Sequence, residues 1–286
     1  MQEIKAEKPP QNLKARIISL VAAGLGLLLV VVLILGGALL AGKVWDPSWN
    51  PFRSNPIKVI DSAFLNLEKV KTIHSQITLH QSSGMNVTVN GDFNFQNPIT
   101  PAGSGTVTIN QGKDFLDANF IVIDSNTYIN VTDASQPLFN SFFQTDLTKK
   151  NEGVWIKLPQ NYSGEGIAVM QHIFVDISKS PTPLYTFENK LPDAFANGQL
   201  LYQYQISINS HVLRSIENVV PSRFLPSGFM NVTKEAQISI SNKDNNVYQF
   251  SINNIIEIQN SHFNSNVSIQ APEKYKTFQE VFPELQ

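Results

Sequence analysis

The sequence predicts an α+β fold in which one N-terminal transmembrane helix precedes a curved antiparallel sheet and a few further helices. Three features of its 286 residues predict this fold. A long apolar run lies near the N-terminus, one amphipathic helix pattern follows a proline-rich segment, and most of the remaining chain alternates between apolar and polar residues. Such alternation is typical of strands that bury one face and expose the other to water.

Residues 17–42 carry no charged side chain and consist mostly of Leu, Val, Ile, Ala and Gly. A bilayer core of about 30 Å is crossed by about 20 helical residues, so this run is long enough to span a membrane. The main alternative is a cleaved signal peptide, whose apolar region is shorter, at about 7–15 residues. Residues 38–41 also match a cleavage site poorly, so we expect a retained anchor.

The basic residues around this run give the anchor an orientation. Those that precede it are Lys5, Lys8, Lys14 and Arg16. Only Lys43 follows it closely, so the positive-inside rule places residues 1–16 in the cytoplasm and the C-terminal part of the chain outside. Trp45 and Trp49 stand just beyond the far end, where amphipathic rings favour the membrane interface; packing on the outer domain is the alternative.

The outer part begins with a stalk over residues 43–56, which contains Pro47, Pro51 and Pro56 and is therefore stiff. Residues 57–286 form the outer domain. Its first element is a helix over residues 57–70, with Asn55 as the cap and Pro56 at the first helical position. The apolar face of this helix consists of Ile57, Ile60, Phe64, Leu67 and Val70.

A period of two predicts strands in the first half of the domain. They lie at residues 73–80, 87–95, 106–109, 116–123 and 127–131, with turns at 82–84 and 124–126. In the middle we expect a short helix over 138–147, a strand over 153–159, a helix over 165–178 and a proline-rich loop over 180–196.

Strands return in the last third of the chain. They are expected at residues 200–208, 236–240, 248–258 and 263–269, with a short helix over 212–219 and a turn at 242–246. Most rows have Asn, Gln, Ser and Thr on one face, so that face meets water. The helices are too few to cover the apolar face, which leaves either a sheet that curves onto itself or an apolar cavity.

Composition excludes several classes of function. Only 15% of residues are charged and the net charge is −2, so the chain lacks the basic footprint of a nucleic-acid-binding protein. It has no cysteine, which excludes disulfides, thiolate nucleophiles, Cys-based zinc sites and a lipid-anchored cysteine. An outer domain without cysteine favours a bacterial envelope over a eukaryotic secretory route. We therefore interpret the glycosylation sequons at Asn86, Asn130, Asn161, Asn231 and Asn266 as strand-edge asparagines.

The chain carries no recognisable catalytic motif. Its histidines are His74, His80, His172, His211 and His262, and none has the close spacing of a zinc motif. Residues 103–105 are too short for a phosphate-binding loop and indicate a hairpin or bulge, and residues 163–166 do not form a nucleophile elbow. We expect no enzyme activity, no cofactor and no bound metal; a hydrolase with a non-standard site is the weakest alternative.

Four segments, in this order, carry a resemblance to a known family. They are AFLNLEKVKTIHS at 63–75, GVWIK at 153–157, YQYQISI at 202–208 and IQAP at 269–272. This order resembles the helix-to-strand step, the Gly-x-Trp-x-Lys strand, the Tyr-x-Tyr-x-Val strand and the last strand and exit of LolA-like and LppX-like domains. The resemblance covers roughly residues 57–275.

The resemblance implies an antiparallel half-barrel over a few helices, with an apolar cavity that holds acyl chains. Members of this family carry lipoproteins or glycolipids, or act as envelope sensors. The anchor over residues 17–42 departs from the family pattern of a signal peptide or lipobox cysteine, and it favours a local role over a diffusing shuttle. The segment between the two halves has no clear counterpart in the family.

We therefore expect a single-pass protein with a cytoplasmic N-terminus, whose outer domain binds a lipid, the acyl chain of a lipoprotein or another apolar ligand. The candidate cavity residues are Val89, Phe93, Phe95, Phe120, Tyr202, Tyr204, Phe250 and Ile252. An apolar stripe is most often ordinary core, so the alternative is an envelope scaffold or sensor with a filled core, which binds another protein.

Overall fold

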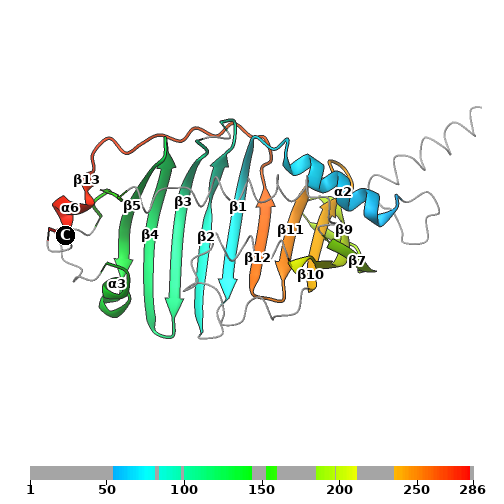
Figure 1. The fold of residues 1–286 in the computed structure, drawn as a ribbon, viewed down its shortest axis with the longest axis horizontal. Helices are drawn as coiled ribbons and strands as arrows, with labels where there is room; N and C mark the ends of the chain where they lie inside the picture. Colours follow the sequence, from blue (N-terminus) through cyan, green and yellow to red (C-terminus); the bar gives the residue numbers. More distant parts are fainter. Residues whose placement is uncertain are drawn as a thin grey trace, which may run out of the picture. The chain divides into compact units, whose positions relative to one another are not determined.

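A computed structural model describes residues 54–80, 84–97, 100–143, 153–159, 185–196, 198–210 and 235–283. The predicted membrane span over 17–42 and the predicted helices over 165–178 and 212–219 lie outside these residues, as does most of the stalk. No helix in the described part of the chain is both long and apolar enough to cross a bilayer. The described residues belong to one compact unit, Ser54–Gln286 (Figure 1).

The first described element is helix α2, Pro56–Leu67. The side chain of Asn55 accepts a hydrogen bond from the backbone N–H of Ile57 at 2.9 Å, and Pro56 occupies the first turn, as predicted. The buried face differs from the predicted one. Val59, Ile60 and Ala63 are buried, whereas Ile57 is 49% exposed, because the helix turns its first residue away from the sheet.

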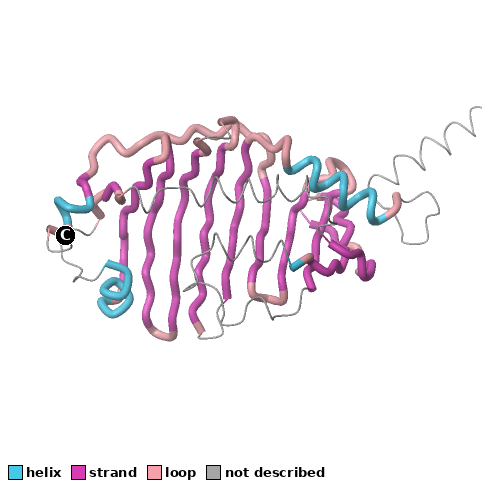
Figure 2. The backbone as a smooth tube through the Cα atoms, in the orientation of Figure 1, coloured by secondary structure: helices cyan, strands magenta, loops and turns pink. Residues whose placement is uncertain are grey.

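In the described part of the chain, thirteen strands form a single sheet, which Figure 2 shows in magenta. The first six are β1 (Thr72–His80), β2 (Met85–Asn94), β3 (Ala102–Gln111), β4 (Asp114–Ile123), β5 (Asn126–Ala134) and β6 (Ile156–Lys157). The others are β7 (Tyr185–Lys190), β8 (Ala194–Ala196), β9 (Gln199–Ile208), β10 (Glu235–Ser241), β11 (Val247–Ile252), β12 (Ile256–Ser261) and β13 (Lys276–Thr277).

The sheet consists of two meanders that meet in its middle. Its order is β13-β6-β5-β4-β3-β2-β1-β12-β11-β10-β9-β7, and β8 pairs with β9 outside this path. Strand β1 therefore pairs with β2 on one side and with β12 on the other. The sheet is curved and does not close, which agrees with the predicted half-barrel (Figure 1). One pair departs from the antiparallel prediction, since the two-residue strands β13 and β6 run parallel.

Five predicted segments differ from the structure. The predicted loop over 180–196 contains strands β7 and β8, because its prolines lie outside the short stretches that pair with β9. The predicted strand over 248–258 is a hairpin, in which Asn253 and Asn254 turn the chain with φ of 45° and 56°.

The other three segments differ in whether they form a strand or in how long that strand is. The predicted strand over 263–269 is irregular, and the strand predicted over 153–159 is reduced to β6. Residues 103–105, predicted as a hairpin or bulge, lie within β3 and pair with β2 without a register shift.

Two further helices lie at the other end of the sheet from α2 (Figure 1). Helix α3, Gln136–Phe143, covers the described part of the helix predicted over 138–147, and α6 is the short helix Phe278–Val281. Helix α3 packs against β4, and α6 packs against β6 and β13, whereas α2 packs against β7, β10 and β11. The apolar face of the sheet is thus covered by helices at its two ends.

Candidate functional site

One row of in-register side chains crosses the concave face of the sheet from β5 to β9. We call it the central row, and it consists of Val131, Ala118, Val107, Val89, Ile77, Ile258, Phe250, Ile238 and Tyr204. Residues directly opposite each other on neighbouring antiparallel strands point to the same face. The central row is therefore one continuous apolar stripe.

The burial of this stripe changes along its length. Val131 and Ala118 at one end are 1% and 2% exposed, and Ile238 and Tyr204 at the other end are each 1% exposed. The five residues between them, on β3, β2, β1, β12 and β11, are only half-buried. Because strands are about 4.8 Å apart, these five span roughly 20 Å of sheet. The middle of the concave face is therefore hollow, while its ends are filled.

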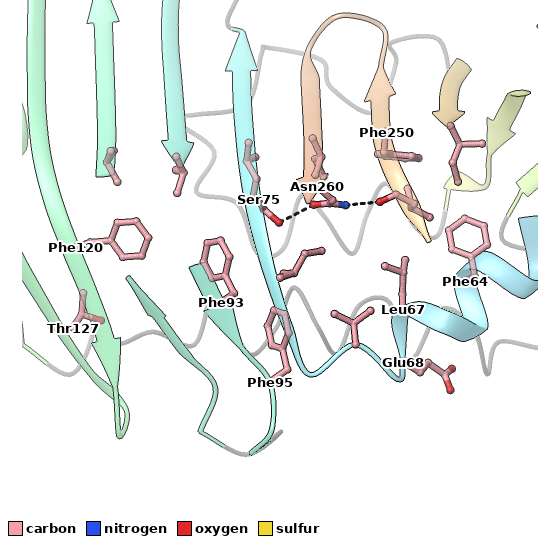
Figure 3. Close-up of a pocket in the computed structure, with 18 of the residues that line it drawn as sticks. Phe64, Leu67, Glu68, Ser75, Phe93, Phe95, Phe120, Thr127, Phe250 and Asn260 are labelled. Atoms are coloured by element: carbon pink, nitrogen blue, oxygen red, sulfur yellow. Dashed lines mark hydrogen bonds between the residues drawn. The ribbon is translucent and has the colours of Figure 1, made fainter. Parts of the chain in front are cut away.

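A cavity of about 450 Å³ occupies this hollow. Its lining comprises Phe64, Leu67, Glu68, Val70, Ile73, Ser75, Ile77, Val89, Phe93, Phe95, Val107, Phe120, Thr127, Ile129, Ile238, Val247, Phe250, Ile258 and Asn260. Fifteen of these 19 residues are apolar. The volume lies in the range of small-molecule and cofactor sites, about 300–1,000 Å³. Figure 3 shows Phe64, Leu67 and Glu68 on one side of the cavity, and Phe120 and Thr127 on the other.

Three aromatic rings form the central wall of the cavity. The ring of Phe93 stacks with that of Phe95 at a centroid distance of 6.4 Å, and with that of Phe120 at 6.3 Å.

Two glycines face each other beside this wall. Phe120 lies directly opposite Gly105, which in turn lies opposite Gly91. A Cβ atom at either glycine would overlap the backbone of the facing strand, so only glycine allows this close approach.

Four polar residues interrupt the apolar lining. Ser75 Oγ donates a hydrogen bond of 2.7 Å to Asn260 Oδ1, and Asn260 Nδ2 donates one of 3.0 Å to the carbonyl of Val247 (Figure 3). This pair joins β1 to β12, where the two meanders meet. Glu68 is exposed and lies at the rim. Thr127 Oγ1 is buried and has no hydrogen-bond partner among the described residues.

The structure brings five of the eight predicted cavity residues together. Val89, Phe93, Phe95, Phe120 and Phe250 all line the cavity. The other three predicted residues, Tyr202, Tyr204 and Ile252, lie on the same face but do not line it. They belong to the packed core beneath α2, together with Ile60 and Ala63 of that helix. The structure therefore places these three residues in packed core, where residues of α2 complete the cluster.

The prediction missed the contribution of the helix and of β1. Phe64 and Leu67 were recognised as part of the apolar helix face but not as cavity residues. Ile73, Ser75 and Ile77 line the cavity from the strand in the middle of the sheet. Ser75 carried a detectable signal, since it is the polar member of an otherwise apolar row in β1.

The described histidines lie away from the cavity lining. His74 Nδ1 is 2.8 Å from Asp92 Oδ1, and the His74 and His262 rings are 5.8 Å apart. His80 Nδ1 is 2.9 Å from Asn86 Oδ1. Within the described ranges, no group of three or more His, Cys, Asp or Glu side chains is arranged to hold a metal ion. His172 and His211 lie outside those ranges.

Comparison with known proteins shows similarity in fold. No family model matches the chain, and no curated protein matches it. The crystal structure of LprF from Mycobacterium bovis is similar at a TM-score of 0.51 and 11% identity, covering 75% of this chain and 95% of LprF. This similarity shows that the chain shares its fold with LprF.

Two further solved structures show weaker similarity. The lipoprotein LppX of Mycobacterium tuberculosis gives a TM-score of 0.45 at 15% identity, covering 76% of this chain and 100% of LppX. A putative outer membrane lipoprotein-sorting protein domain from Vibrio parahaemolyticus gives 0.20 at 9% identity, covering 73% of this chain and 92% of that domain.

Proposed function

We propose that this protein binds the hydrocarbon part of a lipid, or the acyl chain of a lipoprotein, non-covalently in the cavity. The hollow middle of the central row is the observation that carries this proposal. Five apolar side chains in a continuous stripe are left half-buried there, although the same stripe is fully packed at both ends. Apolar surface of this kind is stabilised when an apolar ligand covers it.

The energetics suit a ligand that makes few polar contacts. Each methylene group that leaves water gains about 0.8 kcal/mol, so a bound chain gains affinity along its whole length. The aromatic wall of Phe93, Phe95 and Phe120 offers large apolar surfaces to such a chain. Since the lining contains no Lys, Arg or His among the described residues, the part of the ligand inside the cavity is uncharged.

The proposal extends to the place and manner of action. The apolar run over 17–42 would hold the domain at a membrane, and the basic residues before it would place the domain outside a bacterial cytoplasm. We propose that the protein acts by binding and not by catalysis. The alternative of a scaffold or sensor for another envelope protein requires a filled core, and the cavity disfavours it.

A pair of substitutions on neighbouring residues of β3 tests the proposal. Val107 faces the cavity, whereas Thr106 is exposed on the opposite face of the same strand. Full-length protein is purified, and the lipids that accompany it are extracted and quantified by mass spectrometry. We expect bound lipid in the wild type, a loss of at least tenfold in Val107→Asp, and no change in Thr106→Asp, because only Val107→Asp places a charge in the cavity.

Val89→Phe provides a second test that introduces no charge. A ring at this position occupies the cavity, so we expect bound lipid to fall by a similar factor while thermal stability is kept. The proposal is overturned if the wild type carries no lipid and takes up no added methyl palmitate. It is also overturned if neither cavity variant lowers the bound amount.

A further inference from the structure

Among the described residues, one polar atom of the cavity lining has no hydrogen-bond partner. Three buried side-chain polar atoms of the described residues have no hydrogen-bond partner, and of these only Thr127 Oγ1 belongs to the cavity lining. Such orphaned groups are rare in folded proteins because leaving one buried and unpaired is costly. The position therefore leaves a hydrogen-bonding site that none of the described residues fills.

The backbone carbonyl of Thr127 has a hydrogen-bond partner, whereas its hydroxyl has none among the described residues. The backbone carbonyl of Thr127 accepts a hydrogen bond of 2.9 Å from the N–H of Leu158. Its side chain lies in register with Val122 on β4, and that row continues through Gly103 to Phe93 and Ile73, which line the cavity. The hydroxyl thus shares the concave face with the cavity residues, and Figure 3 shows Thr127 on the same side as Phe120.

The other buried polar groups of the lining behave differently. Ser75 and Asn260 satisfy each other and the carbonyl of Val247, as described above. Both of these side chains therefore find their hydrogen-bond partners within the protein. Thr127 is the exception, and a hydroxyl can both donate and accept a hydrogen bond.

We propose that Thr127 Oγ1 is a hydrogen-bonding subsite for an uncharged oxygen of the ligand, such as an ester carbonyl or a hydroxyl. This inference rests on the proposed function and names the class of lipid: a neutral, oxygen-bearing chain is preferred over a plain hydrocarbon. A carboxylate is excluded from the position because no Lys, Arg or His of the described residues lines the cavity and Glu68 adds a negative charge at the rim.

The test uses two probes of equal size that differ only in their oxygens. Full-length protein is stripped of lipid, incubated with an equimolar mixture of methyl palmitate and nonadecane, and separated from unbound probe. The bound ratio is then compared with the ratio left in solution. Nonadecane leaves water more readily than the ester, so the enrichment is compared between variants. One net hydrogen bond predicts that the wild type enriches the ester about three- to tenfold more than a variant without the hydroxyl.

Thr127→Val removes the hydroxyl and keeps the size of the side chain. We expect this variant to lose the three- to tenfold enrichment while it binds as much nonadecane as the wild type. Its thermal midpoint without ligand should be unchanged or raised, because an unpaired buried hydroxyl has been replaced by a methyl group. A purely structural hydroxyl would instead leave the bound ratio unchanged and lower the midpoint.

Ser75→Ala is the matched control, because it deletes a cavity hydroxyl that already has a partner. It should keep the ester enrichment and lower the thermal midpoint. Ionised palmitate, used at alkaline pH as a third probe, should bind more weakly than methyl palmitate.

The possible failures are distinguishable. An unchanged ratio of bound ester to bound alkane in Thr127→Val overturns the subsite alone. Failure of the wild type to bind either probe overturns the proposed function itself.

Discussion

The middle and the ends of the central row differ in what lies above them, although their residues are alike. Tyr204 and Ile238 lie in the packed cluster beneath α2, and Val131 and Ala118 lie in the cluster that includes Leu138 and Phe139 of α3. Between these clusters, Val107, Val89 and Ile77 face the cavity. An apolar stripe on a sheet thus becomes core or cavity lining according to where the helices are placed, and not according to its own composition.

The first expectation from this difference concerns large losses of packing. Tyr204→Ala removes a side chain that is 1% exposed from the filled end, so we expect it to lower the free energy of unfolding by about 3–5 kcal/mol. Val89→Ala shortens a half-buried side chain that already faces open space, and should cost only about 1 kcal/mol. Urea unfolding followed by circular dichroism measures both. Similar losses at the two positions would contradict the division into filled and hollow regions.

The second expectation concerns added volume and has a smaller effect on stability. Ala236 is 1% exposed in the filled end, where Ala236→Phe has no room and should destabilise the protein by about 1–3 kcal/mol. Val89→Phe places the same ring in the cavity, so it should be neutral or raise stability by about 0.5–2 kcal/mol. Thermal unfolding of the two variants without ligand compares them directly. If Val89→Phe were the less stable variant, the cavity would not exist as described.

The smallest expected effect concerns the contact that holds α2 over its end of the sheet. Tyr185 Oη on β7 donates a hydrogen bond of 2.9 Å to Asp61 Oδ1 on α2. Burial, followed by this bond to Asp61, raises the pKa of Tyr185 above its usual value. Tyr185→Phe should therefore lower stability by about 1 kcal/mol at neutral pH, since one hydrogen bond is lost.

The raised pKa also gives this contact a pH dependence. The unfolded chain releases the Tyr185 proton at about pH 10, below the pKa of the folded protein, so the contribution is complete below pH 10 and is lost as the pH rises further. The difference in urea midpoint between wild type and Tyr185→Phe should shrink at strongly alkaline pH. If this difference in midpoint stays constant, the pKa of Tyr185 is the same in the folded and in the unfolded protein, which would contradict the expectation.

Much of the sheet could be predicted because local patterns determine it. Strict alternation fixed which residues of β1, β2 and β9 share a face, and the Asn-Pro step at residues 55–56 marked the start of α2. Strands β7 and β8 escaped prediction because they are short, lie next to prolines and depend on β9 for their pairing. Their local sequence carries little information about that partner.

The cavity itself could be predicted only in part, for a related reason. Phe250 and Tyr204 are both aromatic residues of the central row and carry the same sequence signal. Only Phe250 lines the cavity, because Tyr204 is packed into the same cluster as Ile60 and Ala63 of α2, and this helix reaches the cavity only with its last turn. Where a helix ends above a sheet is a tertiary property, and alternation along a strand does not encode it.

The seam between β1 and β12 has a consequence for how the protein is made. Ser75 and Asn260, which form a hydrogen bond across this seam, are separated by 185 residues in the chain. During synthesis, the hairpins from β1 to β5 therefore emerge long before the strand that covers the free edge of β1. Long-range pairing of this kind folds slowly and leaves an edge open to wrong partners until it is complete. In a nascent chain, that edge stays unpaired until β12 has been made and joins β1.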